Sequence, residues 1–186
     1  MIKLLKISVW IAGSSVVLLG SYLSAIQLTD NFNEVVPGQL YRSAQPSRGD
    51  IDGYVKRYGI RTIINLRGKS DALWYKDEIG AAQHAGISHI DFGLPPSKEV
   101  TPVQARQLIA ILRDMPKPIL VHCETGADPT GLVSAIYLQQ IAGTDERTAE
   151  GQLSILYGHF GIPYLSSTYA MDESWERLEK TFGLKS

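Results

Sequence analysis

Apolar residues along this chain gather in short β-branched runs that alternate with longer segments of helical periodicity. The runs 61–66 and 119–122 are rich in isoleucine, leucine and valine, so each predicts a short buried strand. Residues 101–115 begin with Thr101, Pro102 and Gln104, a capping pattern, and continue with apolar residues at helical spacing. Strands that alternate with helices in this way indicate a mostly parallel sheet covered on both faces.

The remaining segments complete the alternation. Residues 35–41 predict two short strands around Pro37 and Gly38, because proline presets φ and glycine accepts the positive φ of the turn. We expect a further strand at 87–94 and helices at 47–58, 71–85, 130–141, 145–156 and 172–181. The predicted fold is therefore α/β, with a central sheet of four to five strands flanked by helices on both faces.

The N-terminal residues follow a different pattern. The stretch 7–26 carries no charge and matches the roughly 20 residues that span a bilayer as a helix. Lys3 and Lys6 precede it, which favours a cytoplasmic N-terminus and an exported remainder. A cleaved signal peptide is the alternative, although residues 21–25 fit a cleavage site poorly, and a buried core helix is the third.

These features divide the chain into three parts. Residues 1–26 are expected to form a transmembrane anchor or signal, 27–34 a polar linker and 35–186 the folded domain. The domain is then expected outside the cytoplasm, held at the periplasmic side of the membrane or exported after cleavage.

Composition excludes several classes of function. The formal net charge of −1 gives no general attraction to nucleic acid. The chain has one cysteine, which cannot form an internal disulfide. His84, His89 and His159 are scattered without metal-ligand spacing, so no metal site is expected.

That single cysteine lies in the segment 121–131, which reads VHCETGADPTG. An apolar run precedes it and a helical pattern follows, so Cys123 is expected on a tight loop between a strand and a helix N-terminus. Backbone N–H groups of residues Glu124 to Asp128 (Glu124, Thr125, Gly126, Ala127 and Asp128) and the helix dipole would then converge on one point that suits a phosphate. The same field favours a thiolate.

The segment resembles the His-Cys-x5-Arg-Ser/Thr-Gly signature of cysteine-dependent protein phosphatases at every fixed position except Pro129. The stretches LYRSAQP (40–46), TIINLRG (62–68) and YGHF (157–160) are similar to bacterial members of the dual-specificity group, in the same order. The resemblance implies a phosphocysteine mechanism that needs no metal or cofactor. It also implies phosphorylated proteins or small phosphoesters as substrates.

Within this interpretation, Cys123 is the nucleophile and Thr130 could hold its sulfur by a hydrogen bond. His122 would support the loop from behind. Pro129 stands where the family has its phosphate-clamping arginine, and it also lacks an N–H. Arg42 and Arg67 each end a strand, so one of them could replace that arginine; the alternative is that they are surface charges.

The general acid is less clearly indicated. The family carries an aspartate on the loop before the helix that begins at Thr101, and the corresponding loop here has none. Glu99 is the first candidate and Asp91 the second, while Asp128 could act as the base for hydrolysis.

Three functions follow from these features. The first is a phosphomonoester hydrolase of the tyrosine and dual-specificity class, impaired by Pro129. The second is a phosphate-binding module that has kept the loop and lost catalysis. The third is a sulfur-transfer enzyme that carries a persulfide on Cys123.

Overall fold

The computed structural model describes residues 2–183, with the side chains of all of them except positions 2–9, 11, 12 and 16. Five strands form one sheet in the order β1-β2-β5-β3-β4, with β1 antiparallel to β2 and the other pairs parallel. The strands are β1 (Asn33–Val36), β2 (Leu40–Ser43), β3 (Thr62–Asn65), β4 (Ser88–Asp91) and β5 (Ile119–His122). The predicted α/β class and strand number are confirmed.

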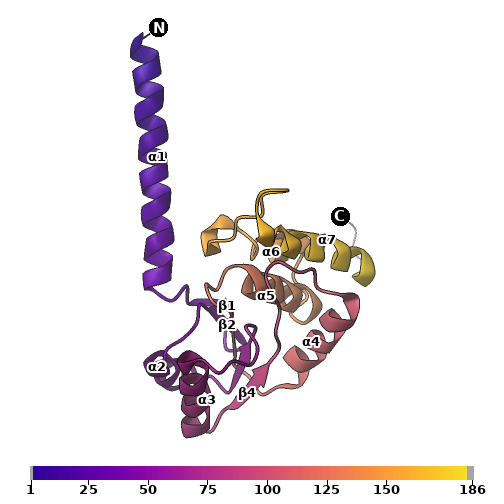
Figure 1. Ribbon diagram of the computed structural model, residues 1–186. Helices are drawn as coiled ribbons and strands as arrows, with labels where there is room; N and C mark the ends of the chain where they lie inside the picture. Colours follow the sequence, from indigo (N-terminus) through magenta and orange to yellow (C-terminus); the bar gives the residue numbers. More distant parts are fainter. Residues whose placement is uncertain (1, 184–186) are drawn as a thin grey trace.

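One helix precedes these strands and the others connect and cover them (Figure 1). The helices are α1 (Ile2–Leu28), α2 (Arg48–Tyr58), α3 (Leu73–Ala85), α4 (Pro102–Asp114), α5 (Asp128–Gln140), α6 (Glu146–Glu150) and α7 (Ala170–Phe182), with 3-10 turns at Ile155–Tyr157 and Ser167–Tyr169. Ser47 and Thr101 cap α2 and α4, each in a complete capping box. Both helix starts confirm the prediction from sequence.

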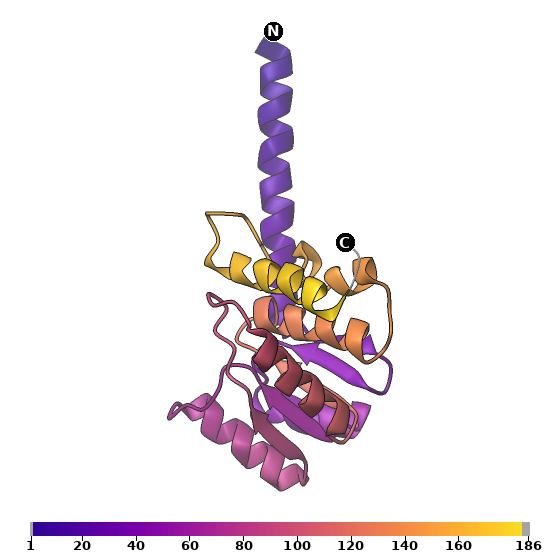
Figure 2. The same cartoon turned by 90° about the vertical axis from the view of Figure 1, so that its right-hand side faces the viewer.

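Successive side chains of each strand enter two different cores, as the pleat of a strand requires. On one face Ile64 and Val121 pack with residues of α4, α5 and α7. On the other face Ile63 and Leu120 pack with residues of α2 and α3. The views in Figures 1 and 2 show the sheet between these two helical layers, and α5 lies buried between the sheet and α7.

One predicted helix is much shorter than expected. Within the segment 145–156, the α-helix covers only Glu146–Glu150, and a separate 3-10 turn begins at Ile155. The Gln152 carbonyl accepts a hydrogen bond of 3.0 Å from Arg42, and a Cβ on Gly131 of α5 would lie 2.7 Å from that same oxygen. The chain is therefore held against α5 by tertiary contacts, which local helical periodicity cannot reveal.

The N-terminal helix α1 projects away from the domain (Figures 1 and 2). Trp10, Val17 and Leu18 are exposed on it, so it is not a buried core helix. Within the part of the chain that the structure describes, no helix combines the length and apolar character needed to cross a membrane, so the expected transmembrane helix is not supported. The side chains of Lys3 and Lys6 lie outside the described set.

The parallel strands bring several chain segments to one edge of the sheet. His122, at the end of β5, pairs with Ser43 of β2 on one side and with Asn65 of β3 on the other. Residues that follow these three strands therefore meet at their carboxyl ends, where parallel α/β sheets place their ligands. Cys123 is the first residue after β5.

Candidate active site

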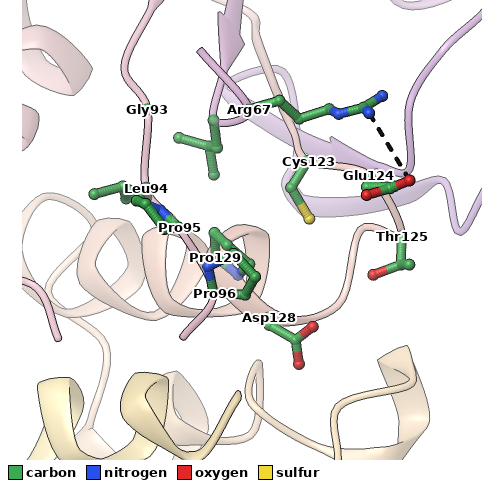
Figure 3. A pocket seen from close by; sticks show the side chains of 11 residues that line it. Arg67, Gly93, Leu94, Pro95, Pro96, Cys123, Glu124, Thr125, Asp128 and Pro129 are labelled. Carbon is green, nitrogen blue, oxygen red and sulfur yellow. Dashed lines mark ion pairs between the residues drawn. The ribbon is translucent and has the colours of Figure 1, made fainter. Parts of the chain in front are cut away.

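A cavity of about 390 Å³ opens at the carboxyl ends of β3 and β5. Cys123 lines it and is 5% exposed, and Figure 3 shows the sulfur directed towards the cavity. Leu66, Leu94, Pro95, Pro96 and Pro129 give it apolar walls. Arg67, Glu124, Thr125 and Asp128 supply its polar side chains.

In the cysteine loop, residues 123–128, the backbone carbonyls accept hydrogen bonds from segments on the side away from the cavity. The Glu124 carbonyl accepts from the Gln45 N–H at 3.1 Å, and the Thr125 carbonyl accepts from Asn31 Nδ2 at 3.0 Å. The Gly126 and Ala127 carbonyls accept from Arg42 Nη2 at 2.7 and 3.3 Å. Because the C=O and N–H of a trans peptide unit point in opposite directions, the N–H groups of residues 125–128 point away from these donors.

Gly126 makes the tight path of this loop possible. Its φ is +72°, and a Cβ there would stand 2.7 Å from the Ala44 nitrogen and from the Ser43 carbonyl carbon. A side chain would thus be strained by the backbone conformation and would also collide with the end of β2. The tight loop expected around Cys123 therefore requires glycine at this position.

Arg42 is the buried support of the loop and is 0% exposed. Its guanidinium also donates to the backbone and side-chain oxygens of Gln152, at 3.0 and 2.8 Å, and lies 4.0 Å from the ring centre of Tyr157. Burial lowers the pKa of Arg42 to about 10, so it keeps its charge at neutral pH. Arg42 is therefore neither a surface charge nor a residue of the cavity wall.

A second buried network lies behind the loop and centres on Glu78. Its carboxylate accepts hydrogen bonds from His122 at 3.1 Å, from His89 at 2.6 Å and from Gln45 at 2.6 Å. Burial alone raises the pKa of Glu78, but the hydrogen bonds from His122, His89 and Gln45 outweigh it and lower the pKa to about 2. His122 thus contacts the ionised Glu78 carboxylate behind the loop, and its supporting role stays a prediction.

The same network reaches the cavity through Arg67. Gln45 accepts a hydrogen bond of 3.0 Å from Arg67 Nη1, and the guanidinium lies 3.9 Å from the ring centre of Trp74. Arg67 also forms an ion pair of 3.8 Å with Glu124, visible in Figure 3. Among the described residues, Arg67 is the one cationic side chain in the cavity wall.

Asp128, at the start of α5, belongs to a third polar group. His159 lies between two carboxylates, with Nδ1 2.8 Å from Asp128 and Nε2 2.9 Å from Asp172. Burial alone lowers the pKa of His159, but hydrogen bonds and charge attraction from both aspartates outweigh it and raise the pKa to about 9. At neutral pH the imidazolium therefore neutralises much of the negative charge beside the cysteine loop.

The other predicted site residues lie as follows. Glu99 forms an ion pair with Arg177 and does not line the cavity. Asp91 accepts hydrogen bonds from Asn65 at 2.9 Å and Tyr75 at 2.6 Å and is also outside the cavity wall. Thr130 is buried, and its hydroxyl has no hydrogen-bond partner within the described part of the chain, the Cys123 sulfur included.

Several residues of this site were not found by sequence reasoning. Gln45, Glu78 and Asn31 hold the loop or its neighbours through contacts between distant segments, which no local pattern indicates. His159 lies within the YGHF stretch, so that stretch was the available signal for its position.

Comparisons with known proteins agree with this geometry. Residues 23–161 match the family described as "DSP-PTPase phosphatase fused to NAD+ Kinase". The dual specificity protein phosphatase TpbA of Pseudomonas aeruginosa is 25% identical over 146 residues, covering 76% of this chain and 60% of TpbA. The match with TpbA of a second P. aeruginosa strain covers 56% of that protein, so the chain spans less than two thirds of these curated relatives.

Solved structures show the same fold. The crystal structure of P. aeruginosa TpbA superposes with a TM-score of 0.60 at 22% identity, covering 80% of this chain and 85% of that chain. The core catalytic domain of the PP-IP phosphatase SIW14 from S. cerevisiae gives a TM-score of 0.59 at 18% identity, covering 82% and 93%. This chain belongs to the DSP-PTPase phosphatase family, a bacterial-type branch of the tyrosine and dual-specificity phosphatases.

The two carboxylates around His159 predict a pH-dependent stability. The pKa of His159 is about 9 in the folded state and 6.5 as the ordinary value. Protonated His159 therefore stabilises the fold fully below pH 6.5, and this stabilisation is lost as the pH rises through about 9. The free energy of unfolding in urea, measured across that range, should therefore fall more for the wild-type chain than for His159→Gln. His84→Gln, at an exposed histidine of α3, is the matched control and should follow wild type. Parallel curves for wild type and His159→Gln would show that His159 carries no such coupling.

Proposed function

We propose that this domain is a phosphomonoester hydrolase that uses Cys123 as its nucleophile and needs no metal or cofactor. The thiolate attacks phosphorus, so that an S–P bond forms while the P–O ester bond breaks and the leaving oxygen takes a proton from an acid. Water then attacks the phosphocysteine, which releases phosphate and restores the thiolate. The observation that carries the proposal is the geometry of the cysteine loop. Its carbonyls accept hydrogen bonds from Asn31 and Arg42 on the side away from the cavity, while the sulfur faces the cavity.

The substrate oxyanion would be bound mainly by backbone. The N–H groups of residues 125, 126 and 128 and the N-terminus of α5 are donors fixed before substrate arrives, which is the arrangement that stabilises developing negative charge most effectively. The Ala127 N–H donates to Thr125 Oγ1 at 3.4 Å. Pro129 interrupts this arrangement, because it brings neither an N–H nor a guanidinium. A proline is compatible with the first turn of α5, so the loss affects anion binding rather than folding.

This reasoning predicts a gain of activity for Pro129→Arg. One fixed donor in an oxyanion site contributes about 3–4 kcal/mol, or about 10²–10³ in rate, and a bidentate cation should contribute at least as much. The value of kcat/KM for an aryl phosphate should therefore rise by at least about 10²-fold in the full chain. Cys123→Ser provides the blank. Equal rates for wild type and Pro129→Arg would refute the proposed impairment.

Arg67 would supply the positive charge that the loop lacks. Gln45 and Trp74 already hold its guanidinium in the cavity wall, so little side-chain freedom is lost when an anion binds. Inorganic phosphate bound in the cavity should protect Cys123 from alkylation by iodoacetamide, and Arg67→Met should weaken this protection about tenfold, as expected for loss of a charge-assisted hydrogen bond. Arg61→Met, at the opposite end of β3, is the matched control and should leave protection unchanged.

For proton transfer we propose Asp128, because its carboxylate lies in the cavity wall and Glu99 and Asp91 do not. Asp128 could serve as the base that activates water, and its hydrogen bond with His159 holds it in place. Glu99 and Asp91 stay predictions for the general acid, which would require side-chain movement away from Arg177 or from Tyr75.

The three carboxylates can be ranked by matched amide variants. In the Pro129→Arg background, Asp128→Asn should lower kcat by about 10²-fold or more, the usual contribution of a positioned acid or base. Asp91→Asn and Glu99→Gln are expected to have smaller effects. A larger loss for Glu99→Gln than for Asp128→Asn would transfer the role to Glu99.

Relatives suggest the substrate class. One structural neighbour is a TpbA variant crystallised in complex with pTyr, and it covers 83% of this chain with a TM-score of 0.60 at 20% identity. The apolar walls formed by Leu66, Leu94 and the prolines would suit an aromatic leaving group. We therefore propose phosphorylated proteins, with phosphotyrosine included, as substrates.

A second candidate function is phosphate recognition without turnover. Pro129 favours it, and so does the cavity wall, which holds two carboxylates and one guanidinium among the described residues. A chain that binds phosphate at Cys123 and yet shows no turnover of an aryl phosphate would match this second function.

The location of the domain is a proposal from sequence. We propose that it lies outside the cytoplasm, anchored through residues 1–26 or exported after their cleavage, because an uncharged stretch follows Lys3 and Lys6. A reporter enzyme that works only outside the cytoplasm can be fused to the C-terminus of the full chain. If the domain is exported, this fusion should show reporter activity. Lys3→Glu with Lys6→Glu should reduce that activity, and an inactive wild-type fusion would contradict export.

A further inference from the structure

The end of α1 and the segment that joins it to the sheet are packed against the domain beside the cysteine loop. Tyr22 donates a hydrogen bond of 2.7 Å to the Leu156 carbonyl, and the Asp30 carbonyl accepts one of 2.6 Å from the Ala44 N–H. A Cβ on Gly158 would lie 3.3 Å from the Ile26 side chain. The end of α1, and with it Asp30 of the expected polar linker, are thus part of the domain's packing.

Asn31 is the central residue of this contact. It is 1% exposed, and its φ of +46° lies in the left-handed region that asparagine tolerates better than most residues. Its amide nitrogen donates to the Thr125 carbonyl at 3.0 Å and to the Tyr157 carbonyl at 2.8 Å, so both side-chain hydrogens are used. Gln27 donates to the same Thr125 carbonyl at 3.2 Å from the exposed side.

We propose that Asn31 is a positioning residue for the anion site, a role that rests on the proposed function of the Cys123 loop. By holding the Thr125 carbonyl outward, it turns the Gly126 N–H of the same peptide unit towards the cavity. Its second bond ties that peptide to Tyr157, whose ring lies against the Arg42 guanidinium that holds the next two carbonyls. Asn31 and Arg42 together fix consecutive peptide units of the loop.

The decisive variant is Asn31→Asp, which keeps size and tolerance of positive φ but removes both donated hydrogens. The new carboxylate would face the carbonyl oxygens of Thr125 and Tyr157, and the repulsion should let the Thr125 peptide rotate. Cys123 is the one cysteine of the chain, so its alkylation by iodoacetamide reports on this site alone. Protection of Cys123 by inorganic vanadate then measures anion affinity in the full chain without any need for turnover.

We expect vanadate to protect Asn31→Asp about tenfold less well than wild type near neutral pH, which corresponds to the loss of about one hydrogen bond. The ratio of the two affinities should return towards one as the pH falls to about 5, because a protonated Asp side chain can again donate. A purely structural defect would not recover with acid. Gln83→Glu, the same amide-to-carboxylate change at an exposed position of α3, leaves both bonds from Asn31 Nδ2 in place and should change affinity less than twofold.

A second variant covers the case in which Asn31→Asp does not fold. Gln27→Ala removes the exposed donor to the same carbonyl and should weaken protection by about twofold to threefold. Unchanged protection in whichever of these variants is folded would overturn the positioning role. Wild-type Cys123 that vanadate does not protect at all would instead contradict the proposed function, so the two failures are distinguishable.

Discussion

The fully buried guanidinium of Arg42 is the interaction on which the candidate site depends. The guanidinium is removed from water and donates hydrogen bonds to the carbonyls of Gly126, Ala127 and Gln152. It therefore fixes both the cysteine loop and the turn after α6. A buried charge is tolerated only where hydrogen bonds replace water, and here backbone carbonyls, the Gln152 side chain and the face of Tyr157 do so for the two Nη groups, while Nε has no partner among the described residues. The loop N–H groups can face a cavity because the opposite edges of the same peptides are already bound.

The cavity wall contains two carboxylates and one guanidinium among the described residues, although the proposed ligand is a phosphate dianion. Arg42 and His159 are buried outside the cavity wall, and Arg67 is the one positive side chain within that wall among the residues that the structure describes. His159 offsets Asp128, and Arg67 offsets Glu124. The site therefore depends on backbone donors and the start of α5 more than on side-chain cations, which makes the geometry of the peptide units unusually important.

Sequence reasoning succeeded where local chemistry decides structure. The capping boxes at Ser47 and Thr101, the turn at Gly38 and the strand-loop-helix junction at Cys123 each depend on residues a few positions apart. It failed where distant contacts override local preference. The helix expected at 145–156 stops at Glu150 because Arg42 and α5 hold Gln152, and residues 27–31, expected as a linker, contact the loop through Asn31.

The sequence by itself determined the α/β alternation, the single cysteine at a strand-loop-helix junction and the proline six residues after it, because each follows from patterns within short segments. Only the tertiary structure decided which polar residues serve that loop. Arg42, Glu78 and Asn31 come from three separate segments of the chain. Each is buried, so its polar atoms need hydrogen-bond partners, and these partners lie far away in the sequence. Hydrogen-bond satisfaction in the interior is a property of the folded arrangement, so no local pattern could have assigned it.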